Sequence, residues 1–479
     1  MLWKGGRKDD ETELDRLLGE PKRAIRGMIV PIFIALLVVE LNQFVDTFWV
    51  SGLGATDAEA VSVVTPLYGL MMCAGLGVSV AATATISFRL GEGRDASDLV
   101  ANSIILGIIF AVASSVLITL FFDVAIDVMG AGSVRGPGWE YMVPFILMSP
   151  AVLIYTILGG ALRGEGAARK STIIQSTAAI LNMVIDPILI YVLGMGIFGA
   201  GLSTCVSALI AVSIGLFWYL KGRTVVPLAR KDFRYDKQAV AEILNIGGPK
   251  TAQNIISNVT DLIQRVFLVI AGGTTAVMLY NYPWRYIGMM GLPWRATDSA
   301  MIPVASAAYG QGDLDKMRES FSYTFKLVIL AGIAAAVIML VFAEPLIAIM
   351  TYEESMHELF SQFVWTLRVS ALLVPFSALM AVESSMLQSM KRAKIAMNYF
   401  FIWAFIKLGL YALAAYGYFG IDPFEAIIYC MVLVHVFGGL CLTYLQRREF
   451  RRIQESIEAA KANPGARIQR ARWKNDGAA

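Results

Sequence analysis

The chain has 479 residues, of which 57% are hydrophobic and 16% are charged, and its formal net charge is +3. A mean hydropathy of +0.62 and a charged fraction well below the roughly 25% of soluble domains exclude a soluble globular protein. The small net charge is uninformative by itself. The basic residues are sorted by position along the chain, which indicates membrane topology rather than binding of nucleic acid.

Twelve apolar segments are long enough to cross a hydrocarbon core, which takes about 20 helical residues. The sequence therefore predicts an all-α polytopic membrane protein with twelve transmembrane helices. The predicted spans lie near residues 25–50, 59–86, 99–122, 139–161, 170–193, 197–219, 241–270, 276–307, 321–343, 359–386, 395–417 and 424–445.

Thirty-two of the forty Lys and Arg residues lie in the N-terminal arm, in alternate loops and in the C-terminal tail. The intervening loops hold only Arg135. By the positive-inside rule, both termini are predicted to be cytoplasmic. We expect a multi-pass protein of the cell (inner or plasma) membrane.

The longest polar interruption contains six basic residues and divides the chain into two halves of six spans. Because six is an even number, the two six-helix bundles should have the same orientation, related by a pseudo-two-fold axis along the membrane normal. The predicted domains are a cytoplasmic arm (1–24), an N-lobe (25–220), a cytoplasmic linker (221–239), a C-lobe (240–446) and a basic cytoplasmic tail (447–479).

The two halves share a turn that follows their second span. Residues 87–95 read SFRLGEGRD and residues 307–315 read AAYGQGDLD. Both carry Gly-x-Gly, which suits a tight exit from a helix. Binding of phosphate is the weaker interpretation, because no strand precedes either motif.

Acidic groups within the first half are the strongest functional signal, because each costs a few kcal/mol at mid-membrane unless it is paired or hydrated. Asp46 lies in span one. Asn182 and Asp186 stand at i and i+4 on one face of span five, and Pro187 should kink that helix and free a backbone carbonyl.

Span six contributes Thr204, one helical turn beyond Ala200, so that a hydroxyl and an exposed carbonyl can join the same group. Hard cations choose carboxylate, amide and hydroxyl oxygens. Two nearby carboxylates without a metal would instead share a proton. The sequence therefore predicts a site for Na⁺ or H⁺, with hydrogen bonds that merely tie the helices together as the alternative.

The second half carries an unusual density of charge within its spans, with seven basic side chains against a smaller number of acidic ones. One interpretation is a polarised central cavity that holds an anionic or zwitterionic group. The alternative is local ion pairing that fixes helix packing, as between Asp261 and Arg265 at i and i+4. The candidate substrate-cavity residues are Tyr141, Asp261, Arg285, Arg295, Asp298 and Glu383.

A repeated Pro-Trp-Arg begins at Pro283 and at Pro293. Both prolines are predicted to bend span eight. Such bends serve either as hinges for gating or as simple kinks whose freed carbonyls bond to neighbouring helices.

At these residues the chain resembles the multidrug and toxic compound extrusion (MATE) family of the MOP flippase superfamily. The matching stretches are VDTFWVSGLG (45–54), TP (65–66), RLGEGR (89–94), ALRGEG (161–166) and NMVIDPILIYVLGMGIFGA (182–200). The resemblance implies a secondary antiporter with an N-lobe and a C-lobe. It also implies that the family's cation site corresponds to Asp46, Asn182, Asp186 and Thr204 with the Ala200 carbonyl.

The predicted function is therefore export of drug-like or organic compounds, cationic or zwitterionic, in exchange for Na⁺ or H⁺ by alternating access. A lipid or lipid-linked oligosaccharide flippase of the same superfamily is the alternative, because several arginines facing one cavity would suit a diphosphate. An enzyme is not expected, and no cofactor is expected besides the coupling ion, for which Asp46, Asn182, Asp186 and Thr204 would be the metal ligands if it is Na⁺. The expected partners are a small-molecule substrate and membrane lipid, not nucleic acid, and the chain is expected to act as a monomer.

Overall fold

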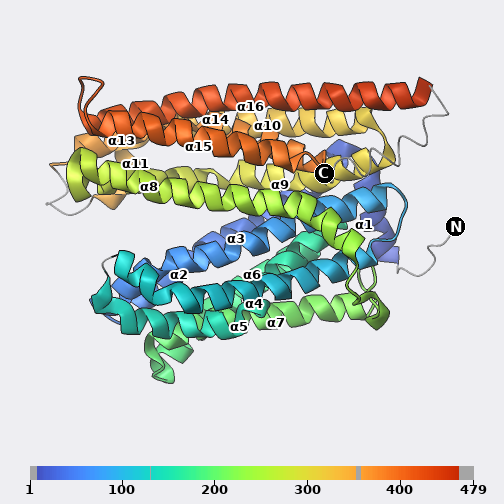
Figure 1. The fold of residues 1–479 in the computed structure, drawn as a ribbon, viewed down its shortest axis with the longest axis horizontal. Helices are drawn as coiled ribbons and strands as arrows, with labels where there is room; N and C mark the ends of the chain where they lie inside the picture. Colours follow the sequence, from blue (N-terminus) through green and yellow to red (C-terminus); the bar gives the residue numbers. More distant parts are fainter. Residues whose placement is uncertain (1–7, 130, 352–357, 463–479) are drawn as a thin grey trace. The chain divides into compact units, whose positions relative to one another are not determined.

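The computed structural model describes residues 8–129, 131–351 and 358–462, which are almost entirely helical (Figure 1). The first seven residues of the predicted arm and residues 463–479 of the predicted tail lie outside them. The α-helices are α1 (Lys8–Leu18), α2 (Pro21–Ser51), α3 (Ala55–Gly91), α4 (Ser97–Val128), α5 (Arg135–Gly164), α6 (Ala168–Pro187), α7 (Gly196–Leu220), α8 (Lys237–Met290), α9 (Leu292–Gln311), α10 (Leu314–Val341), α11 (Ala343–Met350), α13 (Phe360–Ala371), α14 (Val374–Ser389), α15 (Ala393–Ala415) and α16 (Pro423–Ala462).

The predicted all-α membrane fold is confirmed. Within the described residues, 11 helical stretches are long and apolar enough to cross a membrane. One of them, α8, is interrupted by the non-helical Gly272 and Gly273 and so contains two helical segments. The first segment corresponds to the predicted span at 241–270, and the second continues into α9 as the span predicted at 276–307. The twelve predicted spans are thus accounted for.

The described chain forms two compact units. Unit 1 contains the described part of Met1–Ala252 together with Pro303–Met317. Unit 2 contains Gln253–Ile302 and the described part of Arg318–Gly477. The start of α8 and the end of α9 therefore pack with α1 to α7.

Small hydroxyl residues hold α3 against α5 in unit 1. They recur every four residues along α3, so that they share one face of the helix. Each donates a hydrogen bond to a backbone carbonyl of α5, which satisfies a polar group inside the helix packing. The bonds run from Ser79 Oγ to Thr156 O (2.8 Å), from Thr83 Oγ1 to Gly160 O (2.8 Å) and from Ser87 Oγ to Gly164 O (2.7 Å).

The two predicted Gly-x-Gly turns end α3 and α9. Gly93 and Gly312 each have a φ of 71°, in the left-handed region that favours glycine. The amide of Gly93 bonds to Leu90 O, and the amide of Gly312 bonds to Tyr309 O, both at 3.0 Å. The prediction of tight helix exits at both repeats is confirmed.

These equivalent turns also contact each other reciprocally. A Cβ atom added to Gly91 would lie 2.1 Å from Ala307 O, and one added to Gly310 would lie 2.1 Å from Phe88 O. In the aligned repeats Gly91 corresponds to Gly310, and Phe88 corresponds to Ala307. The contact is thus self-complementary, like the interface of a two-fold dimer, and we call these four residues the glycine seam.

An ion-pair network lies beside the glycine seam. The Arg89 guanidinium donates to both oxygens of Asp98 on α4, at 3.0 and 2.8 Å. It also donates to Glu242 Oε2 at the start of α8, at 2.9 and 3.2 Å. Such forked contacts fix geometry as well as charge, and they join the end of α3 to the start of α8.

The predicted linker is anchored by a buried carboxyl group. Glu165, in the turn between α5 and α6, is 0% exposed. Its Oε2 accepts hydrogen bonds from the Val225 amide at 2.9 Å and the Val226 amide at 3.3 Å. Burial raises the pKa of Glu165 to about 8, because the charged form loses its hydration.

Stability should therefore depend on Glu165 and pH. Between pH 4.5 and about 8 the folded chain keeps a proton that the unfolded chain loses, so this group makes stability fall as pH rises through that window. Glu165→Gln keeps an acceptor for both amides without a charge to bury. In thermal unfolding from pH 5 to 9, the free energy of unfolding of the variant, relative to that of the wild type, should rise by at least about 1 kcal/mol towards pH 9. Glu140→Gln, at an exposed position of α5, is the control, and parallel profiles for Glu165→Gln and the wild type would contradict the expectation.

Span eight is interrupted two residues before Pro293, close to one of its two predicted bends. Pro283 lies inside α8, and the interruption falls at Gly291, between α8 and α9. Pro293 is the second residue of α9. Proline is tolerated in the first turn of a helix, where its missing N–H would have no intrahelical partner.

Candidate coupling-ion site

Asn182 is the centre of the polar group predicted in the first half. Its Oδ1 accepts a hydrogen bond of 2.6 Å from Asn42 Nδ2 on α2. Its Nδ2 donates to Asp186 Oδ1 at 3.0 Å and, on α7, to Ser203 Oγ at 2.9 Å and Thr204 Oγ1 at 3.3 Å. One amide thus connects three helices, and its side chain is buried.

Asp186 is 0% exposed and lies one turn from Asn182. Its Oδ1 accepts hydrogen bonds from Asn182 and from Ser203 Oγ. Ser203 Oγ also lies 2.8 Å from the Ala200 carbonyl, and Thr204 Oγ1 lies 3.4 Å from that carbonyl. The predicted Asn182, Asp186, Ala200 and Thr204 are therefore brought together.

Two carboxylate oxygens of this group are buried without a hydrogen-bond partner among the described residues. They are Asp46 Oδ1 on α2 and Asp186 Oδ2 on α6. The two carboxyl groups are close enough to interact electrostatically. A buried ionised carboxylate without a partner is strongly unfavourable, so the arrangement has the chemistry to take up a cation or a proton.

Local sequence explains how α6 and α7 bring these oxygens together. Pro187 ends α6 and is followed by a π-helical turn, η2 (Ile188–Val192), which confirms the predicted break in the regular helix. A Cβ at Gly199 would lie 2.9 Å from the Leu189 backbone carbon, and one at Gly201 would lie 2.5 Å from Tyr141 O. These two glycines let α7 approach its neighbours closely and place Ala200 between them.

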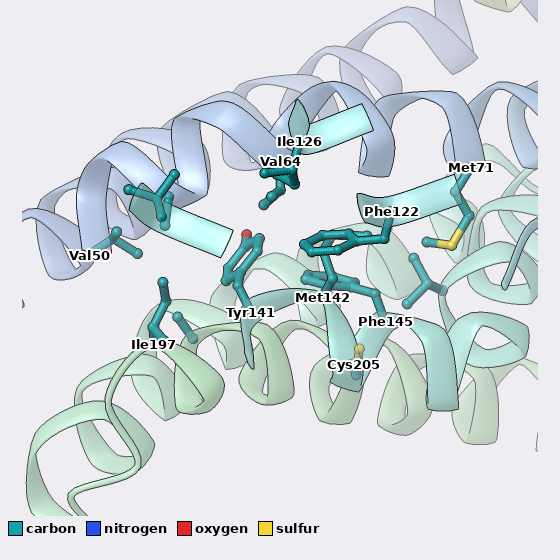
Figure 2. Packing of buried hydrophobic residues seen from close by; sticks show 14 of the residues in the cluster. Val50, Val64, Met71, Phe122, Ile126, Tyr141, Met142, Phe145, Ile197 and Cys205 are labelled. Carbon is teal, nitrogen blue, oxygen red and sulfur yellow. The ribbon is translucent and has the colours of Figure 1, made fainter. Parts of the chain in front are cut away.

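Tyr141 borders this group on its apolar side. It belongs to the buried cluster that also contains Val64, Phe145 and Ile197 (Figure 2). Its hydroxyl is close enough to Asp46 and Asp186 for an electrostatic interaction. Tyr141, predicted as a substrate-cavity residue, thus lies near this polar group, and its ring lies within a packed core.

Ser203 is the residue that sequence reasoning missed. It is 0% exposed and contacts both Asn182 and Asp186. It lies one turn after Ala200 and next to Thr204, so the same helical spacing would have selected it. Asn42, one helical turn before Asp46 on α2, also donates a hydrogen bond directly to Asn182.

The second-half candidates of the predicted cavity occupy different surroundings. Arg285 and Arg295 are exposed. Asp261 pairs with Lys407 on α15 at 3.3 Å, so the predicted pair with Arg265 is wrong. An i to i+4 rule compares only residues of one helix, whereas here the neighbouring helix supplies the closer base.

Two further acids lie beside α14 or on it: Asp298 on α9 and Glu383 on α14 itself. Asp298 Oδ2 on α9 accepts a hydrogen bond of 2.9 Å from Ser385 Oγ. Glu383 is 0% exposed, and neither of its carboxylate oxygens has a hydrogen-bond partner among the described residues. Arg447 on α16 acts on it electrostatically. Across the described part of the chain, no three His, Cys, Asp or Glu side chains cluster as ligands of a metal ion.

Comparison with known proteins identifies the family. The family model MatE matches residues 31–188 and 249–417, more than half of the chain. A FAD transporter from Shewanella oneidensis is 22% identical over 459 residues, covering 92% of this chain and 97% of the relative. The multidrug export protein MepA of Staphylococcus aureus is 27% identical over 269 residues, covering 55% of this chain and 59% of the relative.

Solved structures share the fold. The crystal structure of MATE in complex with MaL6 has a TM-score of 0.87 and 23% identity, covering 92% of this chain and 99% of that one. A MOP superfamily transporter from Pyrococcus furiosus, described as having a binding pocket of reverse polarity that suggests a different function, also has a TM-score of 0.87 and 23% identity, with coverage of 94% and 100%. This chain is a multi-pass membrane protein and not an enzyme. It belongs to the MatE family of secondary membrane transporters, the family that its sequence motifs resemble.

Proposed function

We propose that this protein is an antiporter that exports an organic compound in exchange for Na⁺ or H⁺ bound between Asp46 and Asp186. The observation that carries the proposal is the pair of buried, unpartnered oxygens, Asp46 Oδ1 and Asp186 Oδ2. They lie in a group that already supplies an amide, two hydroxyls and the Ala200 carbonyl. We further propose that the protein lies in the plasma membrane with both termini in the cytoplasm.

The coupling ion acts by changing the net charge of this buried site, where the dielectric constant is low. Two ionised carboxylates near each other repel, and a bound cation or proton removes that repulsion. Because Asp46 belongs to α2 and Asp186 to α6, occupancy changes the free energy of holding these helices together. An ion that binds one conformation of the protein more tightly than another shifts the balance between them.

The test is transport by the purified protein in proteoliposomes under an imposed Na⁺ gradient or an imposed pH gradient. Fluorescent organic cations and FAD serve as trial substrates, chosen because relatives export drugs or transport FAD. Flux that follows one gradient establishes ion-coupled antiport and names the ion. Flux that is indifferent to both gradients, but present for lipid analogues, favours the flippase alternative.

We also propose that the substrate carries an anionic group. The spans of the second half hold more bases than acids, and the FAD transporter is similar over 97% of its length. Arg285 on α8 and Arg295 on α9 are exposed bases within predicted span eight, and we propose that they contact such a group.

Replacing both arginines should therefore discriminate among substrates. The double variant Arg285→Ala, Arg295→Ala is expected to reduce transport of an anionic or zwitterionic substrate about 10-fold or more, because charged hydrogen bonds contribute about 1.5 to 3 kcal/mol. Transport of an organic cation should be unchanged or faster. Arg318→Ala removes an exposed base from α10 as the matched control. If the double variant transports every substrate class as the wild type does, these arginines do not select substrate.

A further inference from the structure

The short helix α1 packs onto the first half of the chain. Leu17 is 2% exposed, and a Cβ at Gly166, in the turn between α5 and α6, would lie 3.1 Å from Leu17 Cβ and from Glu13 O. Lys170 at the start of α6 pairs with Glu13 at 3.1 Å. The same ammonium donates a hydrogen bond of 2.7 Å to the carbonyl of Arg223 in the linker.

The other end of α1 contacts the second half of the chain, still within unit 1. The Leu18 carbonyl accepts a hydrogen bond of 2.9 Å from Lys316 Nζ and one of 3.3 Å from Gln311 Nε2. Gln311 is the middle residue of the second Gly-x-Gly, and Lys316 lies four residues after Gly312, on α10. The last carbonyls of a helix have no intrahelical partner and carry partial negative charge, so a lysine ammonium is a favourable cap.

Helix α1 therefore spans two turns that come from different halves of the sequence. The turn that it reaches through Lys316 and Gln311 directly follows Ala307 and Gly310, the second-half side of the glycine seam. We propose that α1 is a strap that holds the glycine seam closed, and that Lys316 is the group that releases it. The strap rests on the proposed alternating access, in which the predicted cytoplasmic side must open.

The described contacts of α1 with the two turns differ in kind, and we infer from this difference where the strap detaches. On the first-half side, α1 is joined through only Gly19 and Glu20 to α2, buries Leu17 and forms the Glu13–Lys170 ion pair. On the second-half side, the hydrogen bonds to Leu18 O come from two side chains. When the glycine seam opens, α1 remains bound to α5 and α6, and the hydrogen bond from Lys316 Nζ to Leu18 O breaks.

Cysteine accessibility tests the strap without measuring transport. Cys73, Cys205, Cys430 and Cys441 are the chain's four cysteines, so replacing all four with Ala provides a background for a single Ala307→Cys probe. Ala307 is 0% exposed, so reaction with a maleimide reports opening of the glycine seam. Lys316→Ala should raise the labelling rate about three- to tenfold, because a charge-assisted hydrogen bond is lost from the closed state. Lys316→Arg should stay near the wild-type rate.

Two comparisons separate the strap from a local effect on the turn. Arg318→Ala, two residues further along α10, should leave the rate unchanged. Deleting residues 2–18 should accelerate labelling, and adding Lys316→Ala to the deletion should then have no further effect, because the two changes remove the same contact. If the deleted protein does not fold, Glu13→Ala with Leu17→Ala detaches α1 in place.

The possible outcomes distinguish the strap from the proposed function. Two outcomes would overturn the strap and leave the proposed function standing. One is equal labelling rates in Lys316→Ala and Arg318→Ala. The other is the same acceleration by Lys316→Ala whether α1 is present or deleted. A probe that stays unreactive in every variant would overturn the opening of this side of unit 1 that alternating access requires, and with it the strap. Acceleration that depends on α1 supports both.

Discussion

Asp186→Asn and Asp46→Asn are each expected to reduce gradient-driven transport about 100-fold, the upper end of typical coupling between two ligands. Both replacements keep a similar shape and remove the charge. Asp186 Oδ1 already receives hydrogen bonds from Asn182 and Ser203, so its Oδ2 is the oxygen free for an ion. An uncharged amide there neither attracts Na⁺ nor takes up a proton at neutral pH.

The controls for this prediction come from the same helices. Glu40→Gln removes a carboxyl from α2 that lies six residues before Asp46 and should leave gradient-driven flux unchanged. Ser203→Ala removes one hydroxyl from Asp186 and should weaken ion dependence by about 5- to 10-fold, shifting the half-saturating ion concentration more than the maximal rate. Proteoliposome flux against ion concentration measures both effects. Wild-type flux in either Asn variant would refute the assignment of the coupling ion to these carboxyl groups.

Gly91→Ala and Gly310→Ala are expected to abolish most transport and to destabilise the protein by about 3 kcal/mol or more, the scale of overpacking in a closely packed interior. In each case the new methyl group would lie 2.1 Å from a backbone carbonyl oxygen across the glycine seam. No rotamer change relieves such an overlap, because both atoms are fixed to backbone. The turns must separate, so the state in which they touch is lost.

Two other glycines on α3 and α8 provide matched controls. A Cβ at Gly69 or Gly288 would have nothing within 4 Å. Gly69→Ala and Gly288→Ala should therefore leave transport intact and should not lower the melting temperature, since alanine favours the helix by about 1 kcal/mol over glycine. Thermal unfolding and flux are measured on all four variants. Full activity in Gly91→Ala and Gly310→Ala would show that the close approach is not needed in the transport cycle.

Much of the candidate site was accessible to sequence reasoning because its signals are local. The spacing of Asn182 and Asp186 places them on one helix face. Pro187 predicts a break in the regular helix, which the structure shows as a π-helical turn. An acid within an apolar span stands out by its hydration cost, which is how Asp46 was recognised. The repeated Gly-x-Gly likewise predicted two helix exits without any knowledge of packing.

The sequence by itself determined the twelve spans, the excess of basic residues at one predicted membrane side and the principal acids, since hydropathy and helical spacing depend on near neighbours. The tertiary structure decided which residues of different helices meet. Ser203 joins Asp186, Asp261 pairs with Lys407 rather than Arg265, and Lys316 reaches Leu18 from nearly three hundred residues away. Such contacts follow from how helices pack, and packing is set by the shapes of many side chains together, so no single stretch of sequence contains it.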